Sequence, residues 1–189
     1  MATADDGEVI HQTPKDVAER VLALIAIVDK AHNQSPAQLE LWVSEHRIDR
    51  FFSPEETAFF KNPAPSQQEI VNQSWKAECL VVLFWALGLI EELPPLNTTI
   101  SWESIEELKT AIEEPTSFVA RASLRPKEAL NEAEGHLYHQ HWRVWDAQLF
   151  GKPMPEELNP EIVFMRRYAA SWLGRVDISC VKVGRLGSV

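Results

Sequence analysis

Cysteine, glycine and long apolar runs are all scarce in this chain. Its 189 residues include 2 Cys, too few for a framework of disulfides, and 7 Gly, few for a protein rich in turns or β-structure. The longest apolar stretch, Cys79 to Ile90, covers 12 residues and is too short to span a bilayer. Met1 to Thr13 is acidic and polar and lacks the apolar segment of a secretory signal peptide. These absences predict a soluble cytoplasmic protein with no membrane partner, in which Cys79 is a buried free thiol.

Positive charge is also in short supply. The chain has 18 Lys and Arg against 28 Asp and Glu, a net charge of −10. A chain this acidic repels phosphate backbones, which argues against nucleic acid as a partner. It suits a basic protein partner, because complementary charge steers association. The simpler interpretation is that the acidity keeps the protein in solution.

The carboxylates are unevenly distributed along the chain. Five of them gather around one segment in which Lys109 is the only cation, and they form a candidate partner-binding acidic face: Glu103, Glu106, Glu107, Glu113 and Glu114. A run of this kind is more often a solvated helix face, so both interpretations stay open.

Prolines mark the places where helices are expected to begin. Several of the 12 Pro follow a capping residue, as in Thr13-Pro14, Ser35-Pro36, Ser53-Pro54 and Asn159-Pro160. Apolar residues then recur at helical spacing. We predict helices over residues 13–31, 36–49, 54–61, 66–92, 101–113, 115–122, 126–150 and 160–174. Ile178 to Val183 is compatible with a short edge strand.

The segment 66–92 is the predicted centre of the fold. Its first half is amphipathic, whereas Cys79 to Ile90 is apolar on every side, as expected of a helix buried among others. Pro94-Pro95 is expected to terminate it. The predicted architecture is an all-α, irregular helical bundle around this helix, with the helices at 126–150 and 160–174 packed on it. The predicted organisation is a tail over 1–12, one helical domain over 13–175 and a C-terminal extension over 176–189.

Four blocks of the sequence resemble a known family. The central block is Ser74-Trp75-Lys76-Ala77-Glu78-Cys79-Leu80, which continues into Leu83 to Pro94. The others are Ser53-Pro54-Glu55-Glu56 before Phe59-Phe60, then Leu124-Arg125-Pro126 with Glu128, and a closing set from His141-Trp142 to Trp172-Leu173. Together they resemble the bacterial family called domain of unknown function 4272, over roughly Thr13 to Leu173. The family pattern has Glu, His and Asn where this chain has Met165, Arg167 and Ser171. The resemblance implies a fold and supplies no reaction.

Glu78 is the most informative polar residue. It precedes the apolar run directly, so we expect its carboxylate to be buried, and a buried carboxylate needs a partner. Arg125 and Arg166, both in family-like blocks, are the candidate partners. The structural interpretation is an ion pair that fixes helix register, and we favour it. The functional interpretation is a polar pocket formed by Glu78, Arg166 and His141, with Trp75 and Trp142 as its aromatic walls.

The other patterns give weaker support for a functional site. Glu132, His136 and His139 share one helix face and are compatible with a metal, but they do not form a His-Glu-x-x-His pattern, so surface histidines are the favoured interpretation. The chain has no Gly-x-Ser-x-Gly elbow and no phosphate-binding glycine loop. The six Trp at helical positions are expected to belong to the core. No metal and no cofactor are predicted.

These patterns rank two classes of function. The first is a non-enzymatic cytoplasmic module that binds a protein partner, of the immunity or antitoxin kind, since the chain is small, acidic and without a catalytic signature. The second is a small-ligand-binding protein or enzyme that uses the Glu78, His141 and Arg166 pocket. The sequence indicates no oligomeric state.

Overall fold

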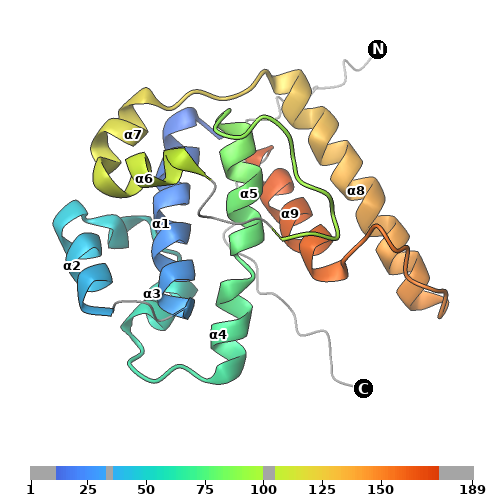
Figure 1. Cartoon of the computed structure of the whole chain (residues 1–189), viewed down its shortest axis with the longest axis horizontal. Helices are drawn as coiled ribbons and strands as arrows, with labels where there is room; N and C mark the ends of the chain where they lie inside the picture. The colour runs from blue at the N-terminus through green and yellow to red at the C-terminus, as the bar shows by residue number, and fades with distance from the viewer. Residues whose placement is uncertain (1–11, 33–35, 100–104, 175–189) are drawn as a thin grey trace, which may run out of the picture.

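The computed structural model describes residues 12–32, 36–99 and 105–174, and within these ranges the protein is all-α, with no strand (Figure 1). The all-α prediction is therefore confirmed. The predicted tail up to residue 11, the extension over 176–189 and the strand from Ile178 to Val183 lie outside these ranges. None of the described helices is long and apolar enough to cross a membrane.

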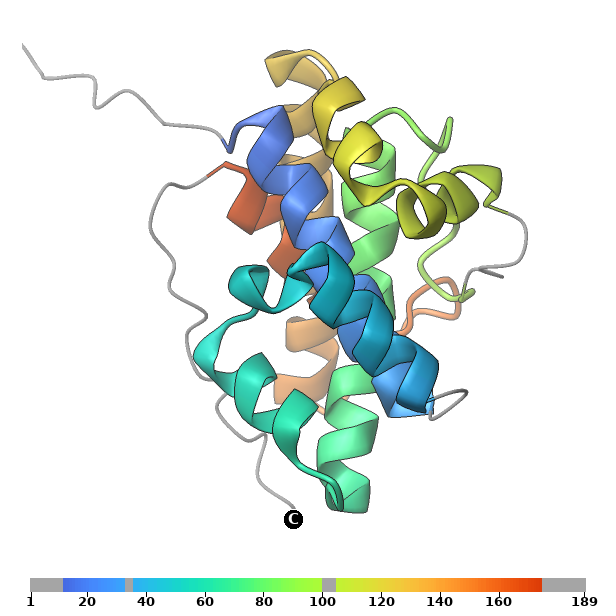
Figure 2. The same ribbon diagram turned by 90° about the vertical axis from the view of Figure 1, so that its left-hand side faces the viewer.

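The first helix, α1 (Pro14–His32), runs through the interior of the protein. All eight residues from Val21 to Val28 are buried, because their side chains are apolar or small all round the helix. Its neighbours include α4, α5 and α7 (Figures 1 and 2). α1 therefore shares the centre of the fold with the segment that the sequence placed there.

Short helices surround α1. They are α2 (Pro36–His46), the 3₁₀ turn η1 (Ile48–Phe51), α3 (Pro54–Lys61) and α4 (Gln67–Ser74). Two of them, α3 and α4, begin with a capping box. In α3 and α4 a serine side chain accepts from the third backbone N–H, and a glutamate at that third position accepts from the serine N–H. The glutamates are Glu56 and Glu69, and only Glu56 is buried.

The predicted helix over 66–92 is two helices, α4 and α5 (Ala77–Ala86). They are separated at Trp75 and Lys76. Around this break the N–H groups of Lys76, Glu78 and Cys79 bond to the carbonyls three residues back, at 3.1, 3.0 and 3.0 Å. The predicted burial is confirmed, since α5 is buried from Glu78 to Phe84. The predicted continuity over 66–92 is wrong.

The predicted end of the central helix, at Pro94-Pro95, is also wrong. Gly88 has a left-handed backbone, φ 75°, and the Leu89 N–H bonds to the Phe84 carbonyl at 2.9 Å. This pair of features is a Schellman motif, which ends a helix where glycine takes the left-handed conformation without steric cost. The helix therefore stops at Ala86, well before Pro94-Pro95.

Four helices complete the fold towards the C-terminus. They are α6 (Glu106–Glu113), α7 (Pro115–Arg121), α8 (Lys127–Leu149) and α9 (Pro160–Leu173). α9 packs against α5, and α8 packs chiefly against α9 rather than on the central helix as predicted (Figure 1). α8 is therefore an outer helix with one side covered.

Candidate functional site

Glu78 and Arg166 form the buried ion pair that the sequence favoured. Arg166 Nε lies 2.8 Å from Glu78 Oε2, and both residues are buried. Burial raises the pKa of Glu78, and the charge and hydrogen bond of Arg166 offset part of that effect. The pair joins α5 to α9 across the core.

Arg166 also holds the loop that follows α5. Its Nη1 donates to the carbonyls of Pro94 and Pro95, at 2.5 and 3.2 Å, and its Nη2 donates to the Thr98 carbonyl at 3.0 Å. Four acceptors around one buried guanidinium leave it little capacity for a ligand. The geometry therefore matches a structural role.

Arg125 lies elsewhere, at the C-terminal end of α5. Its Nε donates to the Trp85 carbonyl at 2.7 Å, and its Nη2 donates to the Ile90 and Glu91 carbonyls at 2.8 and 3.0 Å. The guanidinium also lies 5.1 Å from the Trp85 ring centroid. Arg125 therefore caps α5 and is no partner of Glu78.

We expect Arg125→Lys to lower the free energy of unfolding by about 1–2 kcal/mol, because an ammonium cannot reproduce the planar fork that reaches three carbonyls. Urea unfolding followed by tryptophan fluorescence measures this loss. Arg121→Lys, on the exposed surface of α7, is the matched control and should leave the midpoint unchanged. Equal stability of the two variants would contradict the capping role.

His141 is separated from the Glu78–Arg166 pair. It lies on α8, where its Nδ1 is 3.4 Å from Nη1 of Arg167 and its ring is 6.2 Å from that of Phe164. Partial burial, and then the charge of Arg167, lower the pKa of His141. The structure thus brings together two of the four predicted polar residues, Glu78 and Arg166, and places Arg125 and His141 at two other positions.

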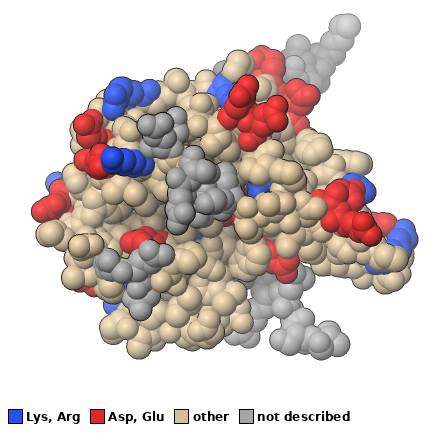
Figure 3. Space-filling view, viewed as in Figure 1, with Lys and Arg blue, Asp and Glu red and all other residues tan. Residues whose placement is uncertain are grey.

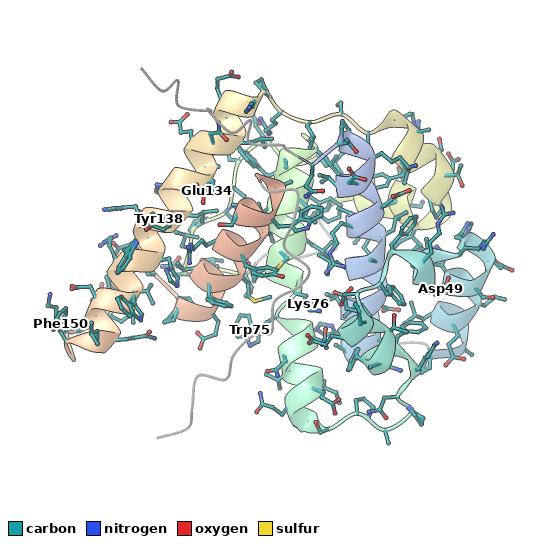
Figure 4. The ribbon with its side chains drawn as sticks, turned by 180° about the vertical axis from the view of Figure 1, so that it is seen from behind. Asp49, Trp75, Lys76, Glu134, Tyr138 and Phe150 are labelled. Atoms are coloured by element: carbon teal, nitrogen blue, oxygen red, sulfur yellow. The ribbon has the colours of Figure 1, made fainter. Side chains whose placement is uncertain are left out.

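The two predicted pocket aromatics also lie apart. Trp75 is the C-cap of α4, beside Lys76 (Figure 4). Trp142 lies on the outer side of α8 and is 45% exposed, and Trp145 is 47% exposed, so the prediction that both are core residues is wrong.

A row of exposed apolar side chains follows one side of α8. We call it the aromatic stripe, and it consists of Tyr138, Trp142, Trp145, Leu149 and Phe150. The rings of Tyr138 and Trp142 are 6.2 Å apart at 75°, and those of Trp142 and Trp145 are 5.1 Å apart at 77°. Edge-to-face contacts of this kind are a favourable arrangement of aromatic pairs. Figure 4 shows the two ends of the stripe, Tyr138 and Phe150, along α8.

Two members of the predicted acidic face can be placed. Glu113 and Glu114 are exposed at the end of α6, with long contacts of 3.8 Å to Lys109 and 3.6 Å to Arg121. Glu103 and the side chains of Glu106 and Glu107 lie outside the described part. The potential partner-binding role of this face stays a prediction.

A second buried charge cluster was not predicted. Glu56 is fully buried, and its two carboxylate oxygens accept from Arg20 Nη1 and Nη2 at 2.7 and 2.5 Å. Lys76 Nζ lies 2.8 Å from Oε1. Burial alone would raise the pKa of Glu56, but the hydrogen bonds and charges of Arg20 and Lys76 together outweigh it and lower the pKa to about 2. Two cations thus surround one carboxylate.

A groove lies beside this cluster, between α9 and the helices α1, α3 and α5. We call it the α1–α9 groove. Its lining residues are Arg20, Leu24, Glu55, Lys76, Cys79, Leu83, Phe164, Met165, Tyr168, Ala169 and Trp172. Cys79 donates from Sγ to the Met165 carbonyl at 3.4 Å, and burial raises the pKa of its thiol to about 12, so it is no nucleophile.

Comparison with known proteins adds a family and no activity. The family model described as Domain of unknown function (DUF4272) matches residues 2–179, which include every residue of the clusters above. No curated protein and no solved structure matches the chain.

Proposed function

Because the chain belongs to the DUF4272 family, whose description names no activity, we propose from the geometry that it is a protein-binding module. In this proposal the aromatic stripe of α8 contacts a basic, apolar segment of another protein. The observation that carries it is the exposure of the five stripe residues, each between 44% and 64%. Contiguous exposed apolar surface is typical of interaction sites, and Trp and Tyr are enriched among the residues that dominate binding energy.

The position of the stripe on α8 supports this proposal. Leu130, Leu137 and Val144 follow each other at seven-residue spacing and face the interior. Tyr138, Trp142 and Trp145 form a second apolar row, rotated by about a quarter-turn or more from the first at 100° per residue. One side of α8 therefore packs against the core, and the other side is available to a partner.

Charge around the stripe indicates the chemistry of that partner. Residues 127–161 carry seven carboxylates against three Lys and Arg, a difference of −4 with neutral histidines, and Arg167 of α9 adds one cation 5.0 Å from the Tyr138 ring centroid. Figure 3 shows acidic atoms near both ends of α8. Lys and Arg side chains of a partner would find carboxylates at the rim and indole faces at the centre of this surface.

Affinity capture with the full chain tests this proposal. We expect Trp142→Ser/Trp145→Ser to lose a basic partner that the native chain recovers from cells of the source organism, with at least a tenfold loss of affinity when that partner is purified. Leu41→Ser, at a 58% exposed leucine of α2, is the matched control and should retain binding. Raising the salt concentration should weaken the complex.

Two results would contradict this function. One is recovery of the same proteins by the native chain and the tryptophan double variant. The other is a homodimer in light scattering that the double variant abolishes, because the stripe would then be covered by a second copy. The circular dichroism of both variants should match that of the native chain, since the three replaced side chains are exposed.

The finer part of the proposal is that binding neutralises the partner, as an immunity or antitoxin-like protein does. It is supported by the acidic surface and rests on the binding itself. Co-expression tests it: the native chain, and not the tryptophan double variant, should relieve any growth defect that the partner causes.

A further inference from the structure

The α1–α9 groove combines an apolar wall with a cationic end. Six of its eleven lining residues are apolar: Leu24, Leu83, Phe164, Met165, Ala169 and Trp172. Arg20 and Lys76 are the cations that border it, and both belong to the Glu56 cluster. A site with this distribution suits a ligand that is apolar over most of its length and anionic at one end.

Lys76 has hydrogen-bond donors that an anionic group could accept from. An ammonium has three donors, and among the described residues its one acceptor is Glu56 Oε1, at 2.8 Å. Its side chain is 16% exposed, so water is partly excluded and charge interactions are stronger than at the surface. In the view from behind, Lys76 lies between the ribbons of α5 and α1 (Figure 4).

A second cation borders the groove beside Lys76. Arg20 and Lys76 both contact the buried carboxylate of Glu56. Glu55 is the carboxylate among the lining residues, but it is exposed and its Oε1 accepts from Gln73 Nε2 at 3.1 Å. Water screens its repulsion more than that of a buried group.

The size of the groove limits the ligand. Its volume is about 60 Å³. Since a single water requires roughly 10–15 Å³ by this measure, the groove encloses the equivalent of roughly four to six waters. This is enough for a short hydrocarbon group and too little for a long acyl chain.

We propose that the α1–α9 groove binds a short apolar carboxylic acid. The ligand carboxylate accepts from the Lys76 ammonium, and the hydrocarbon part lies against Leu83, Met165 and Trp172. This site is separate from the aromatic stripe, and the inference does not depend on the proposed protein partner.

Binding of three six-carbon probes to the full chain tests the inference. Hexanoate, 1-hexanol and hexylamine have the same number of carbon atoms and differ in the head group. Isothermal titration, with tryptophan fluorescence as a second readout, should show hexanoate binding at least tenfold more tightly than 1-hexanol and hexylamine. Acetate should not bind measurably, because it lacks the apolar part. Equal affinity for hexanoate and 1-hexanol, or no hexanoate binding at 10 mM, would overturn the inference.

Charge variants locate the carboxylate. Lys76→Met should abolish the preference for hexanoate over 1-hexanol, whereas Glu55→Gln should strengthen hexanoate binding. Lys61→Met, at an exposed lysine of α3, is the matched control and should bind as the native chain does. The hexanoate affinity of Glu55→Gln can be measured even if Lys76→Met does not fold. If Glu55→Gln binds hexanoate with unchanged affinity and a folded Lys76→Met still prefers hexanoate to 1-hexanol, the anion lies elsewhere. Retention of hexanoate binding by Trp142→Ser/Trp145→Ser separates this site from the stripe.

Discussion

Replacing Arg166 by methionine should lower the free energy of unfolding by about 3–5 kcal/mol. The substitution leaves the buried Glu78 carboxylate without its counter-ion, and breaking one partner of a buried pair costs about this much. It also removes the donors to the carbonyls of Pro94, Pro95 and Thr98. Urea unfolding followed by circular dichroism gives the difference, provided that the variant remains folded in buffer.

A second substitution at the same pair distinguishes pairing from packing. In Glu78→Gln/Arg166→Met neither charge is buried alone, so the double variant should be more stable than Arg166→Met by at least about 1 kcal/mol. Arg121→Met removes a surface arginine with a 3.6 Å contact to Glu114 and should leave the unfolding midpoint unchanged. Strictly additive losses at Glu78 and Arg166 would show that the pair contributes no coupling.

Acid should destabilise the native protein through Glu56. Its pKa is about 2 in the folded protein and 4.5 in the unfolded chain. A carboxyl whose pKa is depressed by folding adds stability that is complete above pH 4.5 and is lost as the pH falls towards 2. The expected loss is about 3 kcal/mol. Glu78 acts in the opposite direction, because its pKa is raised, and so offsets part of this loss on acidification.

The variant Glu56→Gln isolates this contribution. It should be less stable than the native chain at pH 7, since Arg20 and Lys76 lose their carboxylate, and the difference should shrink as the pH falls from 4.5 to 2. Glu69→Gln is the matched control, because Glu69 occupies the equivalent position in the capping box of α4 but is exposed, and its effect should be much smaller. A pH-independent difference between the native chain and Glu56→Gln would contradict the pairing.

Local patterns predicted much of the fold. Serine or asparagine before proline identified the starts of α3 and α9, and the apolar run after Glu78 identified the buried part of α5. Burial of Glu78 and its need for a cation were also predictable, because a carboxylate beside an apolar run needs a partner, but the sequence left Arg125 and Arg166 as alternatives and only the structure selects Arg166. Gly88 marks the end of α5, whereas the sequence prediction placed that end at the proline pair further along.

Other features depend on long-range packing. Nothing local indicates that Glu56, 36 residues after Arg20, buries its carboxylate against that arginine. The break at Trp75 and Lys76 has no glycine or proline to mark it. In α8 two apolar rows compete for the interior, and only the position of α9 decides that Leu137 is buried while Trp142 is exposed.

Arg125 and Arg166 impose an order on the folding of this chain during synthesis. The segment from Trp85 to Thr98 leaves the ribosome before Arg125 and long before Arg166, yet its backbone carbonyls accept hydrogen bonds from both side chains. Until synthesis reaches α9, water must solvate those carbonyls and the Glu78 carboxylate, so the N-terminal half lacks what it needs to close its own core. A nascent chain stopped before Arg166 should therefore remain open to proteases and chaperones, however strongly its first helices form.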